Sequence, residues 1–196
     1  MDPADRGVSP EIIESCRRGD RDALRALYEA HKDRVYSIAF YFFHGDAQTA
    51  HDVTQQVFLK LIGGIAKFRG DSAFTTWLYR LVVNACLDRA RRERAETAAD
   101  PEVLNEFVDP AASHEERFAR TELTSAVQAA VVGLPPKLRI AILLRYFDDL
   151  SYADMAAALN CSIGTVASRL SRGHRLLAGR LAHLRAGLPA SDVVKR

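Results

Sequence analysis

The sequence predicts an all-α fold in which two small helical domains are joined by a flexible acidic linker. Apolar residues recur with the 3.6-residue period of a helix on both sides of this linker, and N-cap residues precede the periodic segments. Residues 94–118 keep no sustained period, contain Pro101 and Pro110, and are mostly acidic. Since so long a structureless loop is uncommon inside one domain, we expect domains at 9–93 and 119–186, with 94–118 between them.

The charge of the chain changes sign along its length. The 196 residues carry a net charge of only +2, and 48% of them are hydrophobic, which suffices for one or two cored domains. Residues 80–94 are basic, residues 100–122 are acidic, and the C-terminal segment is basic again. This order favours two modules that each face nucleic acid and are joined by an acidic connector.

Cysteine usage and the absence of long apolar runs are typical of a protein of a reducing, aqueous compartment. Cys16, Cys86 and Cys161 are far apart and form no CxxC pair, so we expect neither a disulfide framework nor a metal site, and no cofactor. No run approaches the ~20 apolar residues of a membrane span, and the N-terminus lacks the apolar core of a signal peptide. We expect a soluble cytoplasmic protein without membrane insertion.

The first three helices are predicted from their caps and apolar stripes. Ser9 and Pro10 begin a short helix, Asp20 caps a longer one that extends to Phe42, and Asp46 caps a third at residues 47–62. His31 lies on the apolar stripe of the second helix, where a core-edge histidine is expected rather than a metal ligand. The third helix presents a weakly charged outer face made of Asp52, Gln55, Gln56 and Leu59. Such a face is either simply solvated or binds a protein partner, and both interpretations stay open.

A loop at residues 63–71 leads to a helix at residues 73–92 with two contrasting sides. The buried side is predicted to hold Phe74, Trp77, Leu78, Leu81, Val82 and Ala85, and the opposite side Thr76, Arg80, Asn84, Asp88 and Arg91. Guanidinium groups suit phosphates, whereas the amide of Asn84 suits a base edge. Phe68 and Phe74, close to Arg69, are candidates for stacking on unpaired bases, while core packing is expected for Trp77.

The C-terminal segment predicts a helix-turn-helix. After a helix at residues 119–132 and another that begins at Pro135–Pro136, Ser151 caps a short helix whose stripe is Tyr152, Met155, Ala156 and Leu159. Asn160 and Cys161 interrupt the period, and Ser162 caps a helix that turns Val166, Leu170 and Leu177 inward. Its other face is polar and basic, with Ser162, Thr165, Ser168, Arg169, Ser171, Arg172 and Arg175. The second helix of such a unit enters the major groove. The alternative is an ordinary helical hairpin with a solvated charged face.

These motifs, in this order, resemble the sigma-70 family of bacterial RNA polymerase sigma factors. The residues that carry the resemblance are Asp52–Phe58 (DVTQQVF), Phe74–Leu78 (FTTWL), Asn84, Asp88–Arg89, Leu134–Pro135, Leu150–Tyr152 (LSY) and Gly164–Leu170 (GTVASRL). The short two-domain form is similar to the extracytoplasmic-function (ECF) group. The resemblance covers about residues 20–184, and the ordered pair of modules is more specific than any single motif.

The resemblance implies a role for each surface. Residues 9–93 resemble sigma region 2: Asp52, Gln55, Gln56, Phe58 and Leu59 are expected to dock on the coiled coil of the polymerase β′ subunit. Phe68, Arg69, Phe74, Thr76, Arg80, Asn84, Asp88 and Arg91 are expected to melt and read the −10 promoter element. Residues 119–186 resemble region 4, in which Ser162, Thr165, Ser168, Arg169, Ser171, Arg172 and Arg175 read the −35 element. The β flap of polymerase, promoter DNA and an anti-sigma factor are further expected partners. Two residues depart from the family pattern. Ala167 stands where many members carry Lys or Arg, and Gln56 stands where Glu is usual.

Three classes of function, a sigma factor, an autonomous regulator and an enzyme, differ in what they predict for this chain. A sigma factor would bind DNA poorly alone and bring core polymerase to selected promoters. An autonomous helix-turn-helix regulator would bind duplex DNA tightly without polymerase, usually as a dimer. An enzyme is disfavoured because Asp52 and Asp88 lie on separate helices without a His or Cys partner, and no Gly-rich phosphate loop is present.

Overall fold

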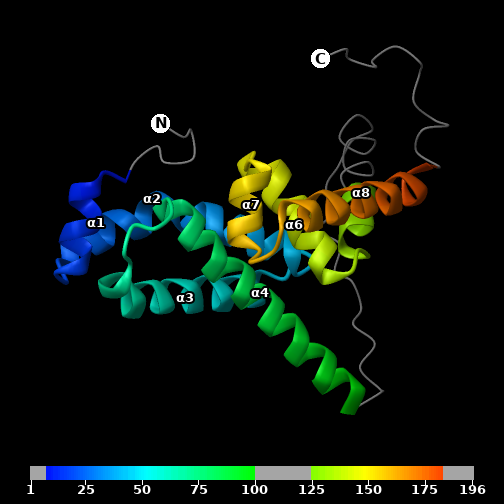
Figure 1. Cartoon of the computed structure of the whole chain (residues 1–196). Helices are drawn as coiled ribbons and strands as arrows, with labels where there is room; N and C mark the ends of the chain where they lie inside the picture. Colours follow the sequence, from blue (N-terminus) through cyan, green and yellow to red (C-terminus); the bar gives the residue numbers. More distant parts are fainter. Residues whose placement is uncertain (1–7, 100–124, 183–196) are drawn as a thin grey trace, which may run out of the picture.

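The structure is a computed structural model that describes residues 8–99 and 125–182, and every regular element in these two ranges is a helix (Figure 1). The predicted all-α fold is thus confirmed. The elements are α1 (Pro10–Arg17), α2 (Arg21–Phe42), α3 (Ala47–Gly64), the 3-10 turn η2 (Ile65–Lys67), α4 (Phe74–Ala99), an unlabelled helix at 125–132, α6 (Pro136–Asp148), α7 (Tyr152–Ala158) and α8 (Ile163–Arg180). We refer to residues 8–99 as the N-terminal module and to residues 125–182 as the C-terminal module.

The helices begin at the predicted caps. The carboxylate of Asp20 accepts from the amides of Asp22 and Ala23 at 2.9 and 3.2 Å, and that of Asp46 accepts from the amide of Thr49 at 3.0 Å. Ser151 and Ser162 cap α7 and α8 in the same way. Each cap satisfies amide groups that have no partner inside the helix, so short polar side chains define where each helix starts.

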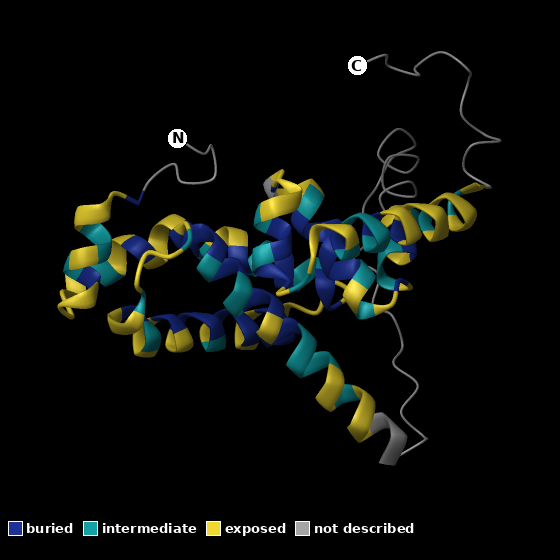
Figure 2. Cartoon of the chain, in the orientation of Figure 1, coloured by how far each residue is buried: buried dark blue, intermediate teal, exposed yellow. Residues whose placement is uncertain are grey.

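The core of the N-terminal module lies where α2, α3 and α4 pack on one another (Figure 2). The stripes that the sequence predicts are buried there, including Val35, Ile38, Ala39 and Phe42 of α2, Val53, Val57 and Leu61 of α3, and Leu78, Val82 and Ala85 of α4. His31 is 7% exposed and packs its ring against Phe74, which agrees with a core-edge histidine.

The C-terminal module is built around buried residues of α6, α7 and α8. Ile140 and Leu144 of α6, Met155 of α7 and Val166 of α8 are fully buried. Gly173 lets α8 approach α6 closely, because a Cβ atom at this position would lie 3.0 Å from Cγ1 of Ile142. Asn160 adopts a left-handed conformation (φ 47°) in the turn before α8, which asparagine tolerates better than most residues.

Three predicted details differ from the structure. Helix α4 continues to Ala99 instead of ending at Arg92, because Arg89 and Glu93 form an i,i+4 pair at 2.8 Å and the following residues are good helix formers. The expected loop after Ile62 is helical through Lys67. Tyr152 is 43% exposed because it occupies the first turn of α7, outside the buried stripe. Residues 100–124 and 183–196, which include most of the expected linker, lie outside the described residues.

The two modules contact each other through α6 against α2 and through α7 against α4. The C-terminal half of α4 projects beyond the other helices (Figure 1). No helix among the described residues combines the length and the apolar character that crossing a bilayer requires. The packing leaves one side of α3, part of α4 and one side of α8 accessible, as well as the outer sides of α1 and α2.

Candidate nucleic-acid and protein interfaces

The outer face of α8 is the most basic surface of the C-terminal module. Val166 and Leu170 are buried beneath it, so the helical period turns Arg172 and Arg175 into solvent and leaves Arg169 half-buried. None of these three guanidinium groups forms an ion pair with a residue that the structure describes. This face can therefore donate to an acidic ligand without first breaking an internal pair.

The start of α8 holds the smaller polar groups of the same surface. The hydroxyl groups of Ser162 and Thr165 lie 2.9 Å apart, and the amide of Thr165 donates to Ser162 at 3.2 Å. Ser171 is exposed, whereas Ser168 is half-buried. The Ser162 cap thus fixes the first turn of α8. All the residues predicted for this face lie on α8 or at its N-cap.

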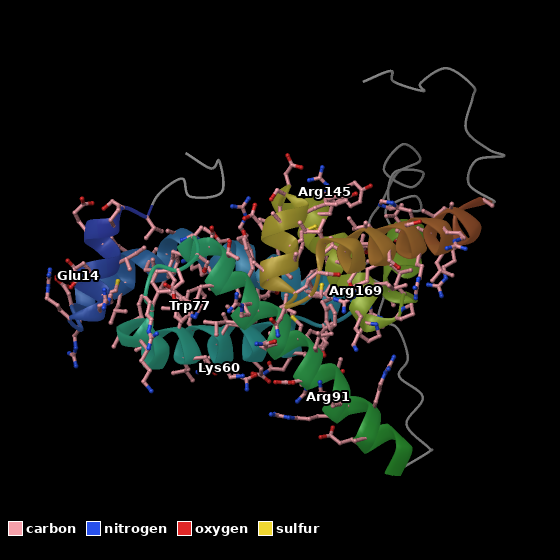
Figure 3. All side chains as sticks on the ribbon, in the orientation of Figure 1. Glu14, Lys60, Trp77, Arg91, Arg145 and Arg169 are labelled. Carbon is pink, nitrogen blue, oxygen red and sulfur yellow. The ribbon has the colours of Figure 1, made fainter. Side chains whose placement is uncertain are left out.

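The outer face of α4 carries a second polar surface. Asn84 and Arg91 are exposed, and Arg91 lies on the projecting half of the helix (Figure 3). Its guanidinium pairs with Asp88 at 3.2 Å. Nε of Arg80 donates to the backbone oxygen of Ala157 at 3.2 Å, so the C-terminal module occupies one cation of this surface. Arg69 is exposed in the segment before α4, beside the half-buried Phe68.

Two residues predicted for this surface are buried instead. Phe74 is 2% exposed and Thr76 is 4% exposed, because the first turn of α4 is enclosed by neighbouring elements. The ring of Phe74 packs against Phe68 and Trp77 at centroid distances of 6.0 and 5.9 Å. Neither side chain can touch a nucleic acid in this arrangement, and we leave both out of the candidate surface. Trp77, predicted as core, is half-buried.

The outer face of α3 combines amides, a carboxylate and exposed apolar side chains. Asp52 and Gln55 are exposed, Gln56 is half-buried, and Leu59 is 63% exposed. Phe58 is the exception to the predicted set: it is 5% exposed, and its ring packs edge-to-face on Tyr28 of α2 at 4.8 Å. A surface contact through Phe58 is therefore not available.

Ile62, which we did not predict as part of a surface, extends the apolar part of the α3 face. Ile62 is 51% exposed and follows Leu59 by three residues, which places both on one side of the helix. An i,i+3 pair of exposed aliphatic residues costs free energy in water and suits an apolar partner. The spacing of three residues between Leu59 and Ile62 could have indicated this pair. We did not use it because we expected the helix to end at Ile62, whereas α3 continues to Gly64.

Arg139 is a second residue for which the sequence predicted no role. Only 8% of this arginine is exposed, and it sits at the junction of the two modules, where it donates to backbone oxygens of both. Burial is the main reason that the pKa of Arg139 is lowered to about 10. Nothing in an isolated Leu-Arg-Ile stretch signals such a role. Among the described residues no group of three or more His, Cys, Asp or Glu side chains is placed to hold a metal ion.

Comparison with known families gives two matches in chain order. Residues 27–96 match the family described as Sigma-70 region 2, and residues 124–177 match Sigma-70, region 4. The first match contains the surfaces of α3 and α4, and the second contains α8.

Individual proteins match over most of their length. The chain is 35% identical to the RNA polymerase sigma-H factor of Pseudomonas aeruginosa over 175 residues, which cover 85% of this chain and 90% of that protein. It is 30% identical to the ECF RNA polymerase sigma factor SigW of Bacillus subtilis, with coverage of 88% and 96%.

Two solved structures share the fold. CnrH in complex with the cytosolic domain of CnrY gives a TM-score of 0.66 at 24% identity, with 92% of this chain and 99% of that chain covered. The sigma factor RpoE in complex with the anti-sigma factor NepR from Bartonella quintana gives 0.65 at 23% identity, with 81% and 96% covered.

Proposed function

Because this chain belongs to the ECF group of the sigma-70 family of RNA polymerase sigma factors, we propose that it binds core RNA polymerase and directs it to selected promoters. The observation that carries this proposal is the ordered pair of family matches, each of which contains an exposed surface of the expected chemistry. The function is one of recognition and not of catalysis. We also propose that it acts in the cytoplasm, where its polymerase partner works.

The α8 face is the proposed reader of the −35 element. The exposed Arg172 and Arg175 and the half-buried Arg169 offer forked donors, which suit guanine edges in the major groove and phosphate oxygens beside it. The hydroxyl groups of Ser162, Thr165, Ser168 and Ser171 can add contacts to phosphates or bases. Ala167 offers no such group, which narrows the possible base contacts to its neighbours.

The α4 face is the proposed reader of the −10 element. Arg69, Arg80 and Arg91 can hold phosphates, and the exposed amide of Asn84 can donate to and accept from a base edge. Phe68 is half-buried beside Trp77, with centroids 5.2 Å apart, so this aromatic edge can stack on an unpaired base. Asp88 would orient Arg91 through their ion pair.

The α3 face is the proposed docking surface for the β′ coiled coil. Leu59 and Ile62 supply the apolar centre, and Asp52, Gln55 and Gln56 supply a polar rim, an arrangement typical of interfaces between proteins. The C-terminal module would contact the β flap.

An anti-sigma factor would compete for these surfaces, since the structurally similar RpoE forms a complex with the anti-sigma factor NepR. Residues 9–93 and 119–186 remain the proposed domains and residues 94–118 the proposed linker, the first residues of which continue α4 as far as Ala99.

We expect Arg172→Ala to weaken polymerase-dependent promoter binding by ~1–3 kcal/mol and to relax the preference for one base, if Arg172 reaches a base edge. A loss that is equal on all sequences would indicate a phosphate contact only. The measurement is a titration of duplexes that differ at single −35 positions. Arg25→Ala, which removes an exposed cation of α2, serves as the matched control and should change nothing.

We expect Leu59→Asp to reduce the affinity for core polymerase at least about 10-fold, since a charge placed in the apolar docking centre must be desolvated. Gln55→Lys, which adds a charge to the polar rim, should reduce the affinity by a smaller factor. Affinity is measured by titrating labelled chain with purified core enzyme, and circular dichroism checks that the helices persist. The charge reversal Arg25→Glu should leave affinity unchanged. Wild-type affinity in both α3 variants would exclude this face as the docking surface.

The proposed function is separated from an autonomous regulator by selecting genomic DNA fragments with the chain alone and with the chain plus core polymerase. Each module offers few cations, so we expect weak and non-selective recovery without polymerase and a shared two-part motif with it. Recovery of the same fragments by the free chain at physiological salt, with a palindromic motif, would favour the autonomous regulator.

A further inference from the structure

A cavity of about 280 Å³ lies where the C-terminal half of α4 meets the start of α6. Its apolar lining comes from both modules: Leu87 and Ala90 belong to α4, and Pro135 and Pro136 begin α6. The two helices are in contact beside it. Because neither module encloses this space alone, the cavity exists only while the modules keep this arrangement.

Three cationic side chains complete the lining of the cavity. Arg91 and Arg94 come from α4, and Lys137 comes from the first turn of α6. All three residues are exposed. Arg91 and Arg94 are three residues apart, so they are neighbours on one side of α4, where like charges repel each other. Positive charge from both modules thus converges on one cavity, and a bound anion would relieve the repulsion.

Acidic side chains do little to neutralise these cations. Neither Arg94 nor Lys137 forms an ion pair with a residue that the structure describes. Arg91 pairs with Asp88 at 3.2 Å, but the two side chains are 77% and 41% exposed. Exposed pairs of this kind contribute little free energy and exchange readily for another anion.

The charge next to the cavity is also positive on balance. Arg139 follows Lys137 by two residues, and its pKa is lowered to about 10 mainly by burial and further by the charge of Arg94. With that pKa the guanidinium of Arg139 stays charged at neutral pH. Glu93, which acts on Arg139 in the opposite sense, is paired with Arg89 at 2.8 Å.

The size and the donors of the cavity favour phosphate groups. Pockets that hold whole cofactors measure roughly 300–1,000 Å³, so a cavity just below this range suits a compact anion. The forked donors of Arg91 and Arg94 match phosphate oxygens, and the ammonium group of Lys137 adds a point charge. No side chain caps α6, so its first amides and the positive end of its dipole also favour an anion there. The apolar lining excludes water and thereby reduces the screening of these charges.

We propose that this cavity binds a short oligophosphate, such as the diphosphate or triphosphate unit of a nucleotide, which joins α4 to α6. Two or three consecutive phosphates can meet cations of both modules at once, which a single small anion does less well. The ligand would favour the arrangement in which Arg80 donates to Ala157 and α7 lies on α4, where the proposed −10 surface is partly covered. This consequence for promoter recognition rests on the proposed function, whereas the binding of the ligand does not.

Isothermal titration calorimetry of the full chain with inorganic triphosphate tests the proposal, in a phosphate-free buffer at about 0.15 M salt. Neither polymerase nor promoter DNA is present, so failure here is distinct from failure of the proposed function. We expect one triphosphate per chain. Arg94→Gln and Lys137→Gln should each weaken binding about 10-fold, since each removes a charge-assisted contact from a different module.

The control is Arg92→Gln, which removes an exposed cation of α4 that does not line the cavity and should bind triphosphate like wild type. Circular dichroism checks that the helices persist in all three variants. No measurable binding to wild type would overturn the proposal. An equal loss in Arg92→Gln would do so by indicating general attraction to charge, and a loss in only one of Arg94→Gln and Lys137→Gln by placing the ligand on one module.

A single-stranded thymidine oligonucleotide separates an oligophosphate site from a site for the DNA backbone. We expect the oligonucleotide to leave triphosphate binding unchanged and its own affinity to be insensitive to Lys137→Gln. Displacement of triphosphate by the oligonucleotide, with the same dependence on Lys137, would replace the proposed ligand by a nucleic-acid strand and overturn the proposal.

Discussion

One buried cation at the junction of the two modules helps to fix the α3, α4 and α8 surfaces relative to one another. Arg139 is 8% exposed and has no carboxylate partner among the described residues, although burying an unpaired guanidinium is costly. Its charge is met instead by backbone oxygens at the C-terminal ends of two helices, α2 and the helix at 125–132, where the helix dipoles concentrate negative potential. Four of its five N–H groups have partners in this arrangement, and only Nε has none among the described residues.

The contact that Arg139 makes with backbone oxygens of both modules is stable but reversible. If α2 withdraws, water can solvate the Phe42 oxygen, while Arg139 keeps the oxygens of Val132 and Leu134 in its own module. A direct carboxylate pair between the modules would have been harder to separate, because it would leave an unpaired charge on each side. The carbonyl contacts therefore suit a protein that must present the α3, α4 and α8 surfaces in a new arrangement on a large partner. With a net charge of +2 and few unpaired cations per surface, each module alone has little electrostatic attraction for DNA.

Local features of the fold could be predicted from the sequence, whereas features of packing could not. The caps at Asp20, Asp46 and Ser162 depend on a few neighbouring residues, and they lie where the sequence analysis expected them. The burial of Phe58, Phe74 and Thr76 depends on which neighbouring helix covers a second side of α3 and α4, which one helical stripe cannot reveal. Arg139 and His44 meet only in the tertiary structure, 95 residues apart along the chain. The α4 boundary was misjudged because the Arg89–Glu93 pair and the alanines outweigh the loss of apolar period.

The central claim is that this chain gives promoter selectivity to a polymerase that holds its two modules apart. The most direct measurement is run-off transcription on genomic DNA fragments by purified core RNA polymerase, with and without the chain, followed by mapping of the RNA 5′ ends. The claim predicts start sites that occur only when the chain is present and that share one upstream motif at a fixed spacing. An identical set of start sites with and without the chain would contradict it.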